Sequence, residues 1–492
     1  MAEPPNDRVL PPSFDAKAFD EVMDVMTTIV GPENVSRDSF HGNLEGPGGE
    51  VLYGDIWPMG DANDHTPSGA IRPKTVKKIQ EIVTAASKYK LPLWTVSRGK
   101  NLGYGASGAV VRGSVILDLH RMNKIIQVSE EHAYAIKGYR LWPSCPALGW
   151  GSVLGNTLER GFGYTPNGEH AEQQCGMEVV LGTGEVVRTG MGALPGSPMW
   201  PLFKGGYGPS KDGLFYQSNL GIVTKLGIHL TPAPASFALC ELSVPSQDQL
   251  ASMVCTLAHL ERENVIQNHT SISNPFRRAL ADLPTNPDLV PRDFALYAAS
   301  PAILDANWAL IQDRIAASIP GATVKLTFRA DASAPSEERL DASKLAVPSQ
   351  YTAIPQYGVP STQNAFLMET RGGKGGHQMA EEAGFDIFAD FHVYGRYVIA
   401  IALVVYRPRD EGERVKALFA RWLEDAERNG VSEYRTHLDY MDRVRGQFHW
   451  PSGDEEGSRD ALGQVLRRLK GVLYPEGILG QGKSGIWTVP RP

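Results

Sequence analysis

The sequence of 492 residues is short of cysteine, of long hydrophobic runs and of basic charge. Its four cysteines show no framework spacing, which indicates reduced thiols in an intracellular protein. The net charge of −7 argues against nucleic acid and anionic membranes as partners. The first residues resemble no secretory signal, and the longest apolar run, 397–406, suits a buried strand. We therefore expect a cytoplasmic protein.

Several motifs of other enzyme classes are also missing. The sequence has no Gly-x-Ser-x-Gly elbow, which weakens a hydrolase interpretation. No glycine stands five residues before Gly99-Lys100, so the Walker pattern is absent. Gly103, Gly105 and Gly108 spell G-x-G-x-x-G, but the residues that follow lead into a strand at 115–119. A Rossmann fingerprint must open a helix, so this match is not one.

The most informative stretch is residues 92–108, PLWTVSRGKNLGYGASG. A short apolar run ends at Val96, and a glycine-rich loop follows immediately. Glycines let the backbone approach a ligand closely, and successive N–H groups in such a loop form a concavity suited to phosphate. We interpret the loop as a pyrophosphate cradle from which Tyr104 projects toward the chemistry. A surface loop without a ligand is the alternative that this stretch alone leaves open.

A chain of 492 residues is long enough for two or three domains, and its hydrophobic periodicity predicts a mixture of helices and strands. We expect helices at 15–30, from Thr75 to about 86, at 304–315 and at 415–426. We expect strands at 115–119, 124–128, 133–136 and 397–406, and a hairpin formed by 176–181 and 185–188. Residues 237 to about 330 are predicted to form a separate unit, and 331–378 to be irregular. This mixture indicates an α+β fold rather than a doubly wound sheet.

Six longer stretches share a resemblance. They are SRGKNLGYG (97–105), GNTLERGFGYTP (155–166), VVRTGMGALPGS (186–197), DGLFYQSNLGIVTK (212–225), EYRTHLDYMD (433–442) and GKSGIW (482–487). Together they are similar to the vanillyl-alcohol oxidase / 4-cresol dehydrogenase family of flavoproteins, which includes eugenol oxidase. The resemblance implies a two-part FAD-binding domain of the vanillyl-alcohol oxidase (PCMH) type and an α+β cap domain. The implied boundaries are 1–64 for an N-terminal helix and wrapping segment, 65–233 for the FAD-binding domain, 237–430 for the cap, and 431–492 for a segment returning to the flavin.

The resemblance also implies an activity, the FAD-dependent oxidation of a para-substituted phenol of the vanillyl alcohol, 4-alkylphenol or eugenol type. Hydride would pass from the benzylic or allylic carbon to flavin N5 through a quinone methide. A phenol has a pKa near 10, so the site must stabilise an oxyanion, and tyrosine hydroxyls with a guanidinium suit that task. Tyr104, Tyr434 and Arg435 match the family's phenolate-binding residues, and Tyr164 matches a further active-site tyrosine.

The cofactor residues follow from the same resemblance. Those implied to hold FAD are Ser97, Arg98, Gly99, Lys100, Asn101, Leu102, Gly105, Gly155, Asn156, Gly163, His170, Ser218, Asn219, Gly221, Ile222 and Lys483. Oxygen or an electron-transfer protein would accept the electrons, and we expect a homo-oligomer. We expect no metal, because we interpret His437, Asp439 and Asp442 as surface and supporting groups.

One departure from the family pattern concerns the covalent attachment of FAD. Relatives tether it to a histidine or a tyrosine, and an ungapped match places Ile399, Ala400 and Ile387 at those positions. His392 is nearby, but its odd separation from Ile399 predicts that it faces the other side of a strand. We therefore predict that FAD is bound non-covalently.

Other departures concern proton transfer and two shortened segments. Ala147 stands where many oxidases of the family have a carboxylate, so Glu169 becomes the candidate acid or base. Segments that relatives have are missing between 138 and 143 and around 372–382. These differences motivate a second hypothesis, in which the chain is a catalytically weakened or inactive family member with a binding or scaffold role, or an incomplete gene product.

Overall fold

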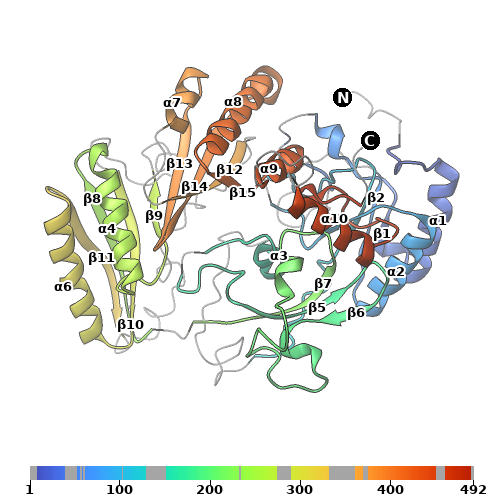
Figure 1. Cartoon of the computed structure of the whole chain (residues 1–492), viewed down its shortest axis with the longest axis horizontal. Helices are drawn as coiled ribbons and strands as arrows, with labels where there is room; N and C mark the ends of the chain where they lie inside the picture. The colour runs from blue at the N-terminus through green and yellow to red at the C-terminus, as the bar shows by residue number, and fades with distance from the viewer. Residues whose placement is uncertain are drawn as a thin grey trace.

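A computed structural model describes residues 8–38, 53–55, 58, 61–101, 103–128, 151–163, 165–231, 234–273, 290–331, 361–369, 375–449 and 460–488. Figure 1 shows two parts side by side. The first part, on the right, is formed by the described residues within 8–231 and 460–488. The second part, on the left, is formed by the described residues within 234–435. The segment 436–449 lies between them. Among the helices of the described chain, none is both long and apolar enough to cross a membrane.

The first part contains two small sheets. One has the strand order β1-β2-β4-β3, with β4 parallel to both β2 and β3, and the other is antiparallel with the order β6-β5-β7. The strands are β1 (Val35–Ser36), β2 (Gly69–Ile71), β3 (Leu93–Val96), β4 (Val115–Asp118), β5 (Gln174–Val180), β6 (Val186–Arg188) and β7 (Ile222–Ile228). The helices are α1 (Ala16–Val30), α2 (Val76–Tyr89), α3 (Val153–Leu158) and α10 (Ala461–Leu473).

Local sequence explains the helices of this part. Asp15 caps α1 by accepting a hydrogen bond from the Ala18 amide at 2.8 Å, and the Thr75 hydroxyl caps α2 in the same way. Their apolar faces enter one core that also contains Tyr474 and Leu479 from the C-terminal region. Leu479 forms a parallel β-bridge with Leu93, the first residue of strand β3. The C-terminal residues therefore complete the core beside the glycine-rich loop, which starts at the end of β3.

The second part is built on one antiparallel sheet of eight strands with the order β11-β8-β10-β9-β13-β14-β12-β15. The strands are β8 (Ser236–Val244), β9 (Thr270–Ser273), β10 (Val290–Ala298), β11 (Thr323–Asp331), β12 (Ser361–Glu369), β13 (Ile387–Tyr394), β14 (Tyr397–Val405) and β15 (Ser432–Arg435). Helices α4 (Leu250–Arg262) and α6 (Pro301–Ser318) cover one end, and α7 (Gly375–Glu382) and α8 (Pro408–Arg428) the other (Figure 1). Helix α9 (Met441–Gln447) follows β15.

The structure confirms the helices and the hairpin but corrects three other sequence predictions. Strands β8 to β11 share their sheet with β12 to β15, so residues 237–330 are not a separate unit. Within the stretch 331–378, which was predicted to be irregular, residues 361–369 form strand β12, and β12 pairs with β14 over its whole length; residues 332–360 and 370–374 lie outside the described residues. The mixed polar and apolar residues of β12 show no clear hydrophobic period, so the structure of this strand depends on its pairing with distant strands. Residues 124–128 form no strand, and 133–136 lie outside the described residues.

Candidate functional site

A cavity of about 770 Å³ lies between the two parts. Its walls come from the glycine-rich loop, helix α3, the segment leading into β7, strand β15 with the residues after it, and the C-terminal region. Elements far apart in the sequence therefore meet around one space, at the kind of junction where cofactors and substrates commonly bind.

Most of the predicted site residues line this cavity. They are Ser97, Arg98, Gly99, Lys100, Asn101, Tyr104, Gly155, Asn156, Ser218, Asn219, Gly221, Ile222, Tyr434, Arg435 and Lys483. Gly105, Gly163 and His170 do not line it. Gly105 packs against Leu438, the Gly163 amide donates to the Gly168 carbonyl, and the His170 amide donates to the Gly161 carbonyl. Leu102, Tyr164 and Ala147 lie outside the described residues, as do the shortened segment at 138–143 and residues 372–374.

The glycine-rich loop has the backbone of a cradle. Gly99 has a φ of +60°, which disfavours any residue with a side chain. A Cβ on Gly155 would lie 2.3 Å from the Ser97 hydroxyl oxygen, so the backbone of helix α3 packs closely against the Ser97 side chain of the loop. The Ser152 hydroxyl caps α3 by accepting a hydrogen bond from the Gly155 amide at 3.0 Å. The glycine-rich loop and helix α3 therefore form one continuous wall of the cavity.

The cavity carries an excess of positive charge. Among its described lining residues, six are basic and two are acidic: Arg98, Lys100, Arg160, Arg435, Arg445 and Lys483 against Glu159 and Glu433. Burial raises the pKa of Glu433 well above its usual value, which favours its neutral form. A wall of this composition suits an anion, such as a pyrophosphate or a phenolate.

The three residues assigned to phenolate binding come together. The Arg435 guanidinium carbon lies 5.2 Å from the centre of the Tyr104 ring, and Tyr434 precedes Arg435 on β15. Burial raises the pKa of the Tyr434 hydroxyl, and the Arg435 charge opposes this increase only in part. The Gln217 side chain donates to the Tyr434 carbonyl at 2.5 Å and ties β15 to the first part. Burial and the Arg435 charge also lower the pKa of His170 to about 4.

Lys483 makes a contact that the sequence analysis did not anticipate. Its ammonium lies 2.5 Å from the Glu159 carboxylate and 5.9 Å from the centre of the Trp94 ring. Burial alone would raise the pKa of Glu159, but Lys483 and Arg435 outweigh it, so this pKa is lowered and the group is ionised. The sequence signal that could have placed Glu159 at the cavity is its spacing from Gly155, which was predicted to hold FAD. Glu159 stands four residues after Gly155, so both share one side of the helical turn.

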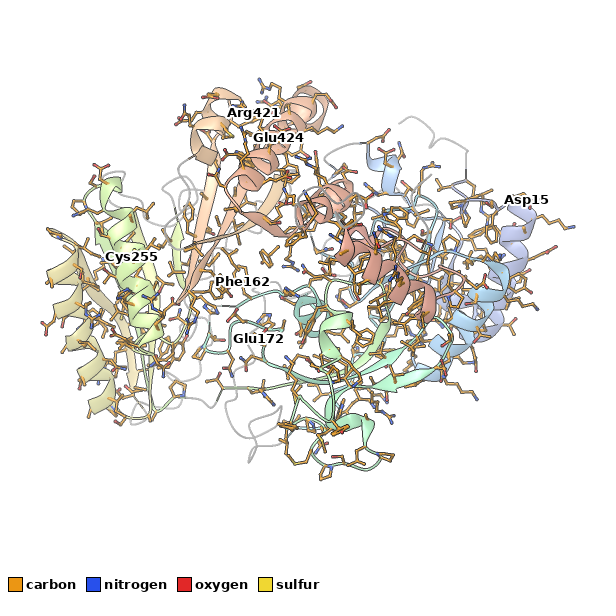
Figure 2. All side chains as sticks on the ribbon, viewed as in Figure 1. Asp15, Phe162, Glu172, Cys255, Arg421 and Glu424 are labelled. Atoms are coloured by element: carbon orange, nitrogen blue, oxygen red, sulfur yellow. The ribbon has the colours of Figure 1, made fainter. Side chains whose placement is uncertain are left out.

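Glu169, the residue considered for proton transfer, lies at the junction of the two parts. Its carboxylate accepts a hydrogen bond from the hydroxyl of Tyr397 on β14. Phe162 lies nearby at the same junction, where Figure 2 labels it. The Phe162 ring packs against His392 at a centroid distance of 4.6 Å and against Tyr394 at 6.4 Å. This cluster of aromatic and charged groups joins the sheet of the second part to the loop after α3.

The prediction that His392 and Ile399 face opposite sides of the sheet is wrong. Strands β13 and β14 form a hairpin in which His392 stands directly opposite Ile399. Residues directly opposite each other in an antiparallel pair point to the same face. Counting parity through the turn at 395–396 caused the error, because alternation holds only within one strand. The prediction of non-covalent FAD therefore depends on Ile399, Ala400 and Ile387 alone.

Known proteins that resemble this chain show which family it belongs to. Residues 67–190 match the protein-family model described as an FAD binding domain. The chain is 32% identical to the 4-cresol dehydrogenase [hydroxylating] flavoprotein subunit of Pseudomonas putida over 98% of both chains. It belongs to the vanillyl-alcohol oxidase / 4-cresol dehydrogenase family. The predicted family and fold class are thus confirmed, and the protein is an FAD-dependent oxidoreductase.

Two solved structures of the family resemble the whole chain. A p-cresol methylhydroxylase with substrate bound superposes with a TM-score of 0.83 at 28% identity and covers 98% of this chain and 99% of its own. A 4-ethylphenol oxidase from Gulosibacter chungangensis, in complex with isoeugenol, has a TM-score of 0.84 at 27% identity and covers 97% and 99%.

The residues of the cavity fit the FAD that the family binds. The backbone cradle and the basic side chains suit its pyrophosphate. Asn219 is held by two hydrogen bonds from its side-chain nitrogen, to the carbonyls of Gly480 at 2.6 Å and Ile486 at 2.9 Å. Its side-chain oxygen is buried and has no partner among the described residues, so it is available to a donor on the cofactor.

Proposed function

We propose that the protein oxidises a 4-alkylphenol or a related para-substituted phenol at its benzylic or allylic carbon. The observation that carries this proposal is the Arg435 guanidinium over the Tyr104 ring, with Tyr434 beside it, on one wall of a basic cavity. The named relatives act on 4-cresol or 4-ethylphenol, which supports this class of substrate.

We assign the phenolate to Tyr104, Tyr434 and Arg435. The guanidinium stabilises the negative charge, and each tyrosine hydroxyl can donate a hydrogen bond to the oxygen. The phenolate then releases electrons through the ring, so the para side-chain carbon becomes a hydride donor and a quinone methide forms. FAD, when bound, supplies the hydride acceptor. We assign the dinucleotide to residues 65–233 and the cover of the substrate to residues 237–430.

We compare two carboxylates, Glu159 and Glu169, as the group that transfers the proton. A general acid or base must lie within hydrogen-bond reach of the proton that it moves. Glu159 lines the cavity, whereas Glu169 binds Tyr397 at the junction of the two parts. We therefore assign this role to Glu159 in preference to Glu169. The electron acceptor is proposed to be oxygen or an electron-transfer protein.

The test is anaerobic reduction of the flavin. The purified holoprotein is mixed with p-cresol, 4-ethylphenol, vanillyl alcohol or eugenol, and its visible absorbance is followed. We expect bleaching with at least one of them, and none with benzyl alcohol, which lacks the phenol hydroxyl. A protein that binds FAD but is bleached by no phenol would refute the proposal and favour an inactive family member.

A separate prediction concerns how FAD is held. Because Ile399, Ala400 and Ile387 cannot form a histidyl or tyrosyl bond to the flavin, we expect acid precipitation to release all of the yellow cofactor into the supernatant. A coloured pellet would contradict this prediction. The same measurement on His392→Ala would then show whether the histidine opposite Ile399 is the point of attachment.

A further inference from the structure

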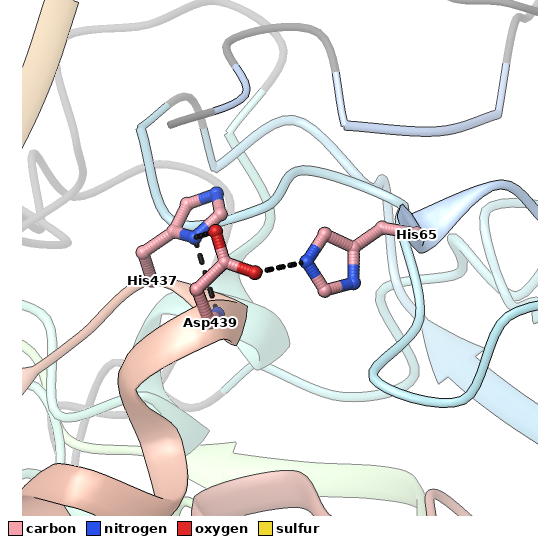
Figure 3. Close-up of side chains that lie close together, drawn as sticks. All are labelled: His65, His437 and Asp439. Carbon is pink, nitrogen blue, oxygen red and sulfur yellow. Dashed lines mark hydrogen bonds and ion pairs between the residues drawn. The ribbon is translucent and has the colours of Figure 1, made fainter. Parts of the chain in front are cut away.

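Four titratable side chains, two histidines and two aspartates, form a chain of contacts next to the segments that carry Tyr104 and Arg435. The His65 Nε2 atom lies 2.7 Å from the Asp439 Oδ1 atom, and the His437 Nδ1 atom lies 3.3 Å from Asp439 Oδ2 (Figure 3). On the far side, His437 Nε2 lies 2.7 Å from Asp55 Oδ2. Both histidines and Asp55 are buried, and the Asp439 side chain is 30% exposed.

The hydrogen bonds of His65 determine its protonation. Its Nδ1 atom lies 2.8 Å from the Ala109 carbonyl oxygen, which can only accept, so Nδ1 carries a proton. In a neutral ring Nε2 would then present a lone pair to an ionised carboxylate at 2.7 Å. Two acceptors at that distance repel each other. A second proton on Nε2 turns the contact into a charge-assisted hydrogen bond.

The surrounding charges favour this doubly protonated form. Burial lowers the pKa of His65, but Asp439 and Ala109 outweigh it and the pKa is raised. His437 differs, because its Nδ1 atom accepts a hydrogen bond from the Asp439 amide at 3.2 Å, so its proton lies on Nε2 and is donated to Asp55. The other titratable groups that face the cluster are Tyr406 after β14 and Tyr440 before α9.

The distances argue for a proton rather than a metal ion. Ligand atoms of His65, His437 and Asp439 all lie within 4.8 Å of one another, so a metal site has to be considered. Ligands at zinc distances around a tetrahedral ion lie roughly 3.3 Å apart. The 2.7 Å between His65 Nε2 and Asp439 Oδ1 is shorter and is typical of a hydrogen bond. Asp442, considered earlier with this group, instead accepts a hydrogen bond from the Trp487 indole at 2.8 Å.

The cluster connects the two segments that carry the phenolate residues. The His65 carbonyl accepts a hydrogen bond from the Ala109 amide at 3.1 Å, so His65 holds Ala109 by both main chain and side chain. Ala109 comes five residues after Tyr104, and Asp439 comes four residues after Arg435. Leu438 also packs tightly on the loop, since a Cβ on Gly105 would lie 2.3 Å from its Cγ.

We propose that protonated His65 and Asp439 are a positioning pair that holds Tyr104 against Tyr434 and Arg435 for phenol binding. This inference depends on the proposed function. The pair touches neither substrate nor cofactor and acts through the two segments that it joins. Its loss widens the spacing between the tyrosine hydroxyls and the guanidinium, so it weakens phenol binding more than it slows hydride transfer at saturation.

Two isosteric substitutions separate the two hydrogen bonds of His65. His65→Asn places its amide nitrogen where Nδ1 stands and keeps the bond to Ala109, whereas His65→Gln places it where Nε2 stands and keeps the bond to Asp439. His259→Gln is the control, because His259 is exposed on helix α4, which covers the end of the sheet away from β15. FAD content and thermal unfolding are measured for each holoprotein to show that it is folded.

We expect both His65 variants to raise the KM for the phenol, and the Kd from the phenol-induced change in the flavin spectrum, by roughly tenfold, or about 1.4 kcal/mol. The kcat should change less, and the control should match the wild-type protein. In the wild type, KM should increase as the pH rises through the raised pKa of His65. In Asp439→Asn this pH dependence should disappear, because neutral His65 can accept a hydrogen bond from the amide.

Three outcomes would overturn the inference. A wild-type KM and pH profile in His65→Asn and His65→Gln would mean that the cluster only stabilises the fold. A stoichiometric metal in the wild-type protein that is lost in His65→Asn would mean that a cation, not a proton, bridges the pair. A wild-type protein whose flavin responds to no phenol would refute the proposed function and this inference together, which the first two outcomes would not do.

Discussion

Replacing Arg435 with methionine should lower kcat/KM for 4-ethylphenol by roughly 10²–10³-fold, which is the usual effect of removing one preorganised group that stabilises an oxyanion. The guanidinium carbon lies 5.2 Å from the centre of the Tyr104 ring, and the Arg435 charge counteracts the increase that burial causes in the pKa of Tyr434. Without it the phenolate would lie beside two neutral hydroxyls in a partly dry cavity. The measurement is the rate of anaerobic flavin reduction against phenol concentration.

Two further variants make this result specific. Arg435→Lys keeps the charge but loses the planar guanidinium, so we expect an intermediate loss. Arg314→Met removes an arginine paired with Glu263 on the surface of α6 and should behave as the wild type. FAD content should be the same in all of them. A kcat/KM within threefold of the wild-type value in Arg435→Met would show that Arg435 does not hold the phenolate.

Replacing Lys470 with alanine should lower the free energy of unfolding by about 3 kcal/mol, because it leaves a cavity and two buried carbonyls without a donor. The Lys470 side chain is fully buried, and its ammonium donates to the carbonyls of Asn219 at 3.0 Å and Leu479 at 2.5 Å. Both of these residues line the cavity. We therefore also expect weaker retention of FAD. Denaturant unfolding and flavin release on dilution measure the two effects.

The pH dependence of this stability gives a second check. Burial lowers the pKa of Lys470 to about 7, whereas the unfolded chain has the ordinary lysine value. Between the two values the unfolded state binds the extra proton, so the wild-type protein should gain stability as the pH rises above 7. Lys470→Met keeps most of the volume and should lack this gain. The difference between them should change by about 2 kcal/mol between pH 7 and pH 9. A constant difference would refute the assigned pKa.

The sequence was most informative where short-range physics decides the structure. Helices α1 and α2 have apolar residues at helical spacing and a capping residue in front, and both form where they were expected. The long motifs around Tyr104 and Tyr434 carried the family resemblance, and the structure brings both residues to one cavity. Strand β12 was missed because its structure depends on β14 and β15, which come later in the chain.

The errors and omissions at the site have a common cause. The face of His392 depends on the turn between β13 and β14, and no alternation rule crosses a turn. The role of Glu159 depends on Lys483, which lies 324 residues later. Local periodicity predicts neither the face of His392 nor the contact between Glu159 and Lys483, because each depends on how separate segments pack together.

By itself, the sequence determined the family and the cofactor, and it named the residues to which we assign the phenolate, since these are encoded in contiguous motifs. Only the tertiary structure decided which groups support them. His65 and Asp439 are 374 residues apart, and neither belongs to a pattern that points to the other. Their contact follows from packing the N-terminal segment, the glycine-rich loop and the segment after β15 together. Because Nδ1 of His65 donates to the Ala109 carbonyl, Nε2 needs a second proton to donate to the Asp439 carboxylate.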